Sequence, residues 1–125
     1  MEILNKNGLA VAVIDKSEKI TDTQAALDAM ATAQYLGANG AMIVYQESLG
    51  ADFFDLKTRF AGEVLQKFSN YRVRLAIVGD FTIYKSKALH DFIYECNQGN
   101  LVLFKDSLAA ALASLAPTVD KKSSP

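Results

Sequence analysis

A short segment of the chain gathers charged and hydroxyl side chains that could bind a partner or ligand. Its members are Asp52, Asp55, Lys57, Thr58 and Arg59. On a helix, Asp55 and Arg59 would lie four residues apart and could form an ion pair, worth under ~0.5 kcal/mol on an exposed surface. Asp52 and Asp55 would set the start of that helix, where its dipole favours negative charge. Two interpretations stay open: a capped helix with a solvated, salt-bridged outer face, or a binding edge.

Asp80 follows the buried apolar run Leu75–Val78 and is the best single candidate for a working carboxylate. Thr82 and Tyr84 lie in the next loop and could line a pocket with it. A carboxylate in such a pocket could act as a general acid or base, or bind a metal ion. The structural alternative is that Asp80 accepts backbone N–H groups and orders this loop. We expect that structural role, and we assign no catalytic residue and no metal ligand.

His90 and Cys96 are the remaining residues with catalytic chemistry. A single histidine excludes a histidine-pair metal site, and a Ser-His-Asp triad would have to use His90. We expect His90 at the surface and Cys96 in the core, because Cys96 shares the apolar face of its predicted helix. No dinucleotide fingerprint is present, since Gly37-Ala-Asn-Gly40 precedes a predicted strand instead of following one. We therefore expect no cofactor.

Length and composition are typical of one globular domain, at 125 residues and 13.6 kDa. A net charge of -1 and a pI near 5.7 argue against nucleic-acid binding, which needs a basic surface. No apolar run approaches the ~18 residues of a membrane helix, and the first residues lack the pattern of a secretion signal. We expect a cytoplasmic protein with one domain over residues 1–116 and a polar, disordered tail over 117–125.

Hydrophobic patterning predicts alternating strands and helices after an opening hairpin. Asn7-Gly8 separates two β-prone segments and favours a tight turn, because both residues tolerate positive φ. Beyond it, short apolar runs typical of buried strands alternate with segments of 3.6-residue periodicity. The expected strands are residues 2–4, 9–14, 41–45, 73–78 and 101–104. The expected helices are residues 25–36, 52–68, 86–97 and 108–115.

The element order β-β-α-β-α-β-α-β-α predicts an α/β domain with a mixed, mainly parallel sheet of four or five strands. The carboxyl ends of parallel strands meet at one edge of the sheet, where open α/β sheets bind ligands. We expect the crossovers to bring residues 52–59 and 80–86 together along one rim at that edge.

Several segments resemble those of known proteins. They are Asp52–Thr58, Ala61–Phe68, Asn70–Arg72, Leu75–Asp80 and Asp91–Asn97. In this order they resemble a family of small bacterial proteins classed as a domain of unknown function, over about residues 21–115. The order of elements is similar to the STAS-like fold of the SpoIIAA-like group, the anti-sigma-factor antagonists and their relatives. The first resemblance implies no established activity, and the second implies partner binding.

The chain departs from the antagonists at their switch element. Their Asp-Ser-Ser-Gly opens the helix after the central strand, and one serine is phosphorylated to release a partner. The corresponding place here is Asp55-Leu-Lys-Thr58, which keeps the aspartate but has Leu56 and Lys57 in place of the serines. A conventional phosphoserine switch is therefore not expected. Ser48 and Thr58 carry nearby hydroxyls, and the sequence leaves open whether either is phosphorylated.

The favoured hypothesis is a non-enzymatic protein-binding or regulatory module that acts through residues 52–59 and 80–86. Lys57 and Arg59 would offer charge to the partner, which is another protein or a second copy of the chain. One alternative is a small-ligand-binding protein or hydrolase that uses Asp80 with Thr58 or Tyr84. Another is a homodimeric structural subunit, because a half-apolar chain rich in aromatics could hide an exposed face in a dimer.

Overall fold

The computed structural model describes residues 1–117, so the tail expected over 117–125 lies, apart from Pro117, outside the described residues. The strands are β1 (Glu2–Lys6), β2 (Leu9–Val13), β3 (Ala41–Tyr45), β4 (Arg74–Val78) and β5 (Val102–Lys105). The helices are α1 (Thr23–Tyr35), α2 (Gln46–Phe53), α3 (Phe60–Asn70), α4 (Lys87–Gln98) and α5 (Leu108–Leu115), with short 3-10 helices η1 (Leu56–Thr58) and η2 (Phe81–Ile83). The predicted α/β fold class and element order are confirmed.

The strands form one mixed sheet in the order β1-β2-β3-β4-β5. β1 and β2 make the predicted antiparallel hairpin, and the other neighbours are parallel. Asn7 and Gly8 form its turn with φ of 51° and 86°, which both residue types adopt readily. Asn7 Nδ2 also donates to the Ala116 carbonyl at 2.8 Å. The hairpin turn therefore holds the chain just beyond α5.

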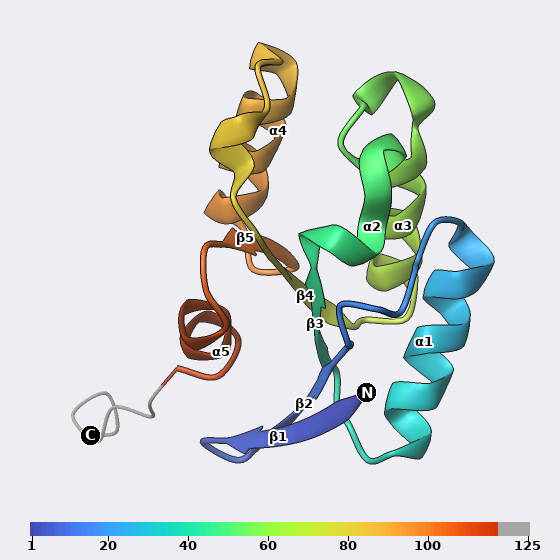
Figure 1. Ribbon diagram of the computed structural model, residues 1–125. Coiled ribbons are helices and arrows are strands. Elements are labelled where there is room, and N and C mark those ends of the chain that lie inside the picture. The colour runs from blue at the N-terminus through green and yellow to red at the C-terminus, as the bar shows by residue number, and fades with distance from the viewer. Residues whose placement is uncertain (118–125) are drawn as a thin grey trace.

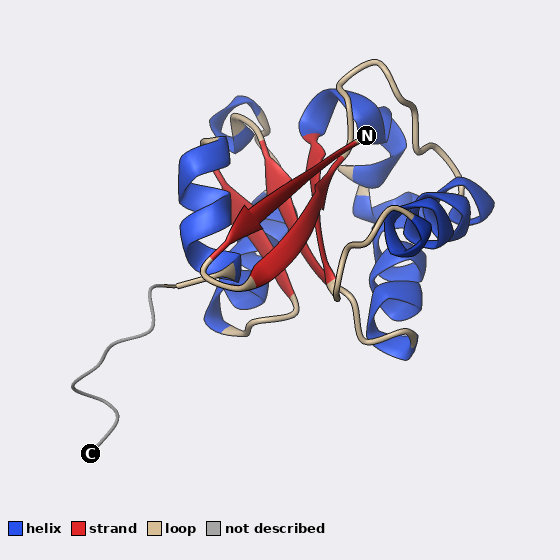
Figure 2. Cartoon of the chain, turned by 90° about the horizontal axis from the view of Figure 1, so that it is seen from below, coloured by secondary structure: helices blue, strands red, loops and turns tan. Residues whose placement is uncertain are grey.

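Helices cover the two faces of the sheet unequally. α1, α2, α3 and α4 pack on one face, in a core that includes Met30, Phe53, Val64 and Leu89. α5 packs on the opposite face through Ala111 and Leu115. Figure 1 shows α5 across the sheet from α1 and α3, and Figure 2 shows the sheet between the two helical layers. One short helix thus covers β3, β4 and β5 on the second face.

The single helix expected over residues 52–68 is wrong, because the chain forms α2, η1 and α3 in succession. Thr58 replaces helical hydrogen bonds across this break. Its Oγ1 lies 2.7 Å from the Asp52 carbonyl and 2.9 Å from the Asp55 carbonyl. Arg59 follows with φ 65°, outside the right-handed helical region. Asp52 lies two residues after a kink at Gly50, whose φ is 75°, so it belongs to the short last turn of α2 and does not begin a helix over residues 52–68.

The break lets three aromatic rings enter the same core. Phe53, Phe54 and Phe60 are all at most 7% exposed, and Phe53 lies edge-on to both others, at 5.0 and 5.9 Å. On one regular helix, Phe53 and Phe54 would point about 100° apart. The gain in aromatic burial is a physical reason for the chain to leave the helix here.

Candidate functional site

An open cleft of about 890 Å³ lies at the edge of the sheet where the parallel strands end. It is lined by residues from the ends of β2 to β5 and from η2 and α4. They are Lys16, Tyr45, Gln46, Glu47, Val78, Gly79, Asp80, Phe81, Thr82, His90, Ile93, Asn97, Phe104, Lys105 and Asp106. This is the edge at which topology predicts a ligand site. Asp80 and Thr82 are the sequence-predicted site residues that line it.

Gln46 ties together the loops at this edge. Its Nε2 donates to the Tyr84 hydroxyl at 2.7 Å and to the Asp80 carbonyl at 3.2 Å, and its Oε1 accepts from the Asp80 N–H at 3.0 Å. Gly79 allows this close approach, because a Cβ there would lie 2.5 Å from Gln46 Cβ. The first residue after β3 therefore fixes the loop that follows β4.

We expect Gly79→Ala to lower the free energy of unfolding by about 1–3 kcal/mol, the usual cost of overpacking. Gln46 must move, since the added methyl group overlaps its side chain. Urea denaturation measures the loss. Gly62→Ala is the matched control, because no atom lies within 4 Å of its added methyl; inside α3 it should stabilise the protein by roughly 0.5–1 kcal/mol. Equal stability of the two variants would contradict the Gln46 contact.

Asp80 orders the loop after β4, as expected from the sequence. Its Oδ1 accepts from the Thr82 N–H at 3.0 Å and from the Thr82 hydroxyl at 2.5 Å. These bonds, led by the hydroxyl, hold the pKa of the Asp80 carboxyl below its usual value. Asp80 is thus a fixed negative charge, poorly suited to act as a general acid at neutral pH.

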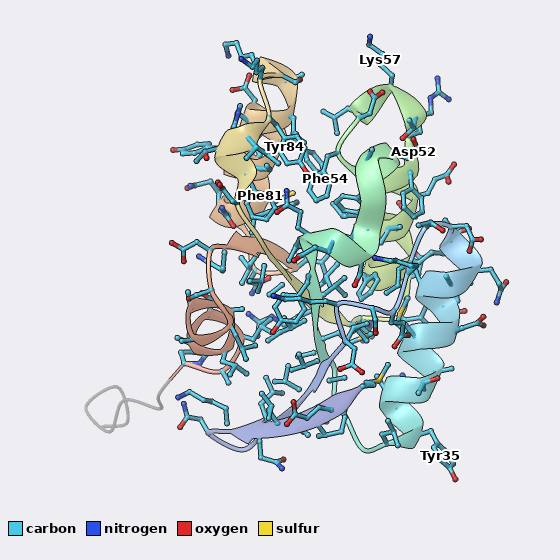
Figure 3. All side chains as sticks on the ribbon, in the orientation of Figure 1. Tyr35, Asp52, Phe54, Lys57, Phe81 and Tyr84 are labelled. Atoms are coloured by element: carbon cyan, nitrogen blue, oxygen red, sulfur yellow. The ribbon has the colours of Figure 1, made fainter. Side chains whose placement is uncertain are left out.

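Residues 52–59 and 80–86 meet along one rim, and we call these two segments the rim. The Phe54 ring stacks on the Tyr84 ring with centroids 4.8 Å apart and planes 15° apart, and Phe81 lies 5.9 Å from Phe54. Figure 3 shows these rings side by side, with Lys57 at the tip above them. Aromatic pairs of this kind contribute about 0.5–1.5 kcal/mol beyond burial. The stack joins two segments far apart in the chain.

The predicted residues of the first segment lie on the rim but do not line the cleft. Asp55 accepts from the Lys57 N–H at 3.1 Å and caps η1, while Lys57, Thr58 and Arg59 are exposed. The ion pair expected between Asp55 and Arg59 is absent from those within residues 1–117. Asp55 instead uses its carboxylate for the cap, and the turn at Arg59 removes the helical spacing.

A family model described as a domain of unknown function (DUF4180) matches residues 6–115. The chain belongs to this family. Neither the curated proteins nor the solved structures contain a significant match. Family membership accords with the resemblance to a domain of unknown function and assigns no activity.

Ser48 and Thr58, the two hydroxyls near the family's central segment, are both engaged by the backbone. Ser48 is completely buried, and its Oγ lies 3.2 Å from the carbonyls of Asp15 and Lys16. Thr58 is exposed, but its hydroxyl donates to the carbonyls of Asp52 and Asp55. Modification of Ser48 therefore requires the start of α2 to open.

His90 is exposed as predicted and anchors the second rim segment in this member of the family. Its Nε2 lies 2.6 Å from the Tyr84 carbonyl, and because a carbonyl only accepts, Nε2 carries the proton. Cys96 is half-buried, and burial raises the pKa of its thiol to about 11. A thiol with that pKa is a weak nucleophile at neutral pH.

Sequence reasoning missed Gln46, Lys16, Lys105 and the anchoring role of His90. A signal existed for three of them, since Lys16, Gln46 and Lys105 follow or end predicted strands at the edge that topology selects. None of the helices formed by residues 1–117 has the length and hydrophobicity of a membrane-spanning segment. The same residues contain no cluster of His, Cys, Asp and Glu arranged to hold a metal ion.

Proposed function

We propose that this protein is a non-enzymatic binding module that holds an acidic surface of a protein partner at the rim. The observation that carries the proposal is the Phe54–Tyr84 stack, which makes one continuous surface of the two segments. A rigid, preformed surface loses less entropy on binding than two independent loops would.

The charges of the rim support an acidic partner. Lys57, Arg59 and Lys85 are exposed and form none of the ion pairs within residues 1–117. Asp52, Asp55 and Asp80 are exposed as well, but the carboxylates of Asp55 and Asp80 already accept N–H groups of their own loops, whereas the three cations have no ion-pair partner within residues 1–117. Complementary charge of this kind speeds association and selects partners.

The hydroxyl chemistry argues against a phosphoserine switch in the STAS-like regulatory role that we propose. Ser48 is buried and Thr58 bonds the backbone, so neither is presented as the antagonists' serine would be. The hydrolase alternative is weaker, because the pKa of Asp80 is lowered and Thr58 lies outside the cleft. Self-association stays a prediction, and a second copy is one form that the partner could take.

Lys57→Glu tests the rim directly. We expect it to reduce capture of the partner from the native cell at least tenfold, because a like charge against an acidic surface costs more than the ~1.4 kcal/mol that a factor of ten represents. Affinity capture followed by mass spectrometry measures this loss, and the thermal melt should be unchanged.

Lys6→Glu is the matched control for that experiment. Lys6 is also exposed and pairs with Leu9, at the opposite end of the sheet from the rim; Figure 1 shows the hairpin turn there. Capture should survive this change of charge. A partner that binds Lys57→Glu as well as it binds the unchanged protein would remove the rim from consideration.

A further inference from the structure

The cleft contains charges of both signs that are separate from the rim's cations. Lys16 is already engaged, since its Nζ lies 3.9 Å from Glu47 and 5.0 Å from the centre of the Tyr45 ring. Lys105 and Asp80 also line the cleft, but neither takes part in the ion pairs within residues 1–117. Asp106, next to Lys105, adds a further exposed carboxylate.

Backbone geometry holds Asp80 and Lys105 near each other, although their side chains form no ion pair. Val78 is the direct strand partner of Lys105, and Gly79 N–H donates to the Lys105 carbonyl at 3.0 Å. Asp80 lies two residues beyond Val78, so strand dimensions put its Cα about 8 Å from that of Lys105. The bonds from Thr82 hold the Asp80 carboxylate in its loop.

An apolar wall lines the same cleft. Phe81 and Phe104 line the cleft with their rings edge to face at 5.2 Å, and Ile93 of α4 adds to it. The cleft volume of about 890 Å³ lies within the ~300–1,000 Å³ typical of small-molecule sites, which combine apolar walls with a few polar groups.

We propose that the cleft binds a small zwitterion in which a protonated amine and a carboxylate share one carbon, as in a free α-amino acid. The amine contacts the free oxygen of Asp80, the carboxylate contacts Lys105, and the hydrocarbon part lies against Phe81 and Phe104. This site shares Asp80 and Phe81 with the rim but uses none of the rim's cations, and it does not require the rim proposal to hold.

The direct test is NMR titration of the isotopically labelled protein with each of the common free amino acids. At least one should shift the resonances of Asp80, Thr82 and Lys105 with a Kd below about 1 mM. Its N-acetyl derivative lacks the amine and its amide lacks the carboxylate, so each should bind at least tenfold more weakly. Undiminished binding of the amide would indicate a site for the amino terminus of a peptide, and undiminished binding of the N-acetyl derivative a site for a carboxyl terminus. Either result would overturn the proposal.

Asp80→Asn and Lys105→Gln each remove one of the two charges, and each should weaken binding about tenfold or more. Asp28→Asn is the control, because this exposed carboxylate on α1 lies outside the cleft. Weaker binding in either cleft variant is attributed to the lost charge when the thermal melt of that variant matches that of Asp28→Asn. No shift with any amino acid at about 10 mM, or unchanged affinity in both variants, would overturn the site. Lys57→Glu should bind the amino acid normally, which separates this site from the rim.

Discussion

Phe54→Ala should lower the free energy of unfolding by about 3–5 kcal/mol, the range for truncating a buried phenylalanine. Phe54 is 6% exposed and contacts three other rings, those of Phe53, Phe81 and Tyr84. Part of this loss is the ordinary cost of a cavity in the core. The remainder belongs to the stack with Tyr84, and urea denaturation of a double-mutant cycle separates the two.

The cycle compares Phe54→Ala, Tyr84→Ala and the double variant. We expect a coupling free energy of about 0.5–1.5 kcal/mol between the two rings. A second cycle that combines Phe54→Ala with Phe92→Ala is the matched control, because Phe92 contacts Phe104 and does not belong to the rim. Additive losses for Phe54 and Tyr84, within about 0.3–0.5 kcal/mol, would show that the rings do not touch in solution.

Arg74→Ala should also lower stability strongly, by about 2–4 kcal/mol, because hydrogen bonds from a charged group contribute roughly 1.5–3 kcal/mol each and are not additive. Its guanidinium donates to the Leu115 carbonyl at 2.7 Å, the Asn100 carbonyl at 2.8 Å and the Ser114 carbonyl at 3.3 Å. Two of these carbonyls end α5, where a cation is favoured. The side chain therefore fastens the helix that shields the second face of the sheet.

Hydrogen exchange of α5 and β4 identifies the origin of that loss, since both should exchange faster when α5 detaches. Arg74→Lys should recover only part of the stability, because one ammonium cannot reproduce the planar fork of donors. Arg72→Ala is the control, as Arg72 is exposed and makes none of these bonds. If Arg72→Ala lowered the free energy of unfolding as much as Arg74→Ala, the proposed role of Arg74 in holding α5 would be contradicted.

The sequence predicted most of the fold because its signals there are local. The dipeptide Asn7-Gly8 predicts the hairpin turn directly. Ser86 and Ser107 cap the helices that follow them, because their side chains accept from the N–H groups of Leu89 and Ala110. The strand order then follows from alternating elements and short connections. Such features depend on residues near one another in the chain.

The break after α2 could not be predicted in this way. Residues 52–68 satisfy helical periodicity, but Phe54 packs on Phe81 and Tyr84 from a distant loop. The contacts of Gln46 were equally hidden, because Gln46 is an uncharged amide whose role depends on the approach of Gly79 and Asp80. The break after α2 and the contacts of Gln46 both depend on packing between segments that are distant in the chain. The type of a single residue does not reveal such packing.

Aromatic NOE spectroscopy of the protein in solution tests the central claim most directly. Joined rim segments require cross-peaks between the ring protons of Phe54 and Tyr84, whose centroids lie 4.8 Å apart, and weaker ones between Phe54 and Phe81. Both sets should persist in Lys57→Glu, which changes only the charge of the surface. Assigned spectra with no Phe54–Tyr84 cross-peak would mean that two separate loops replace the rim.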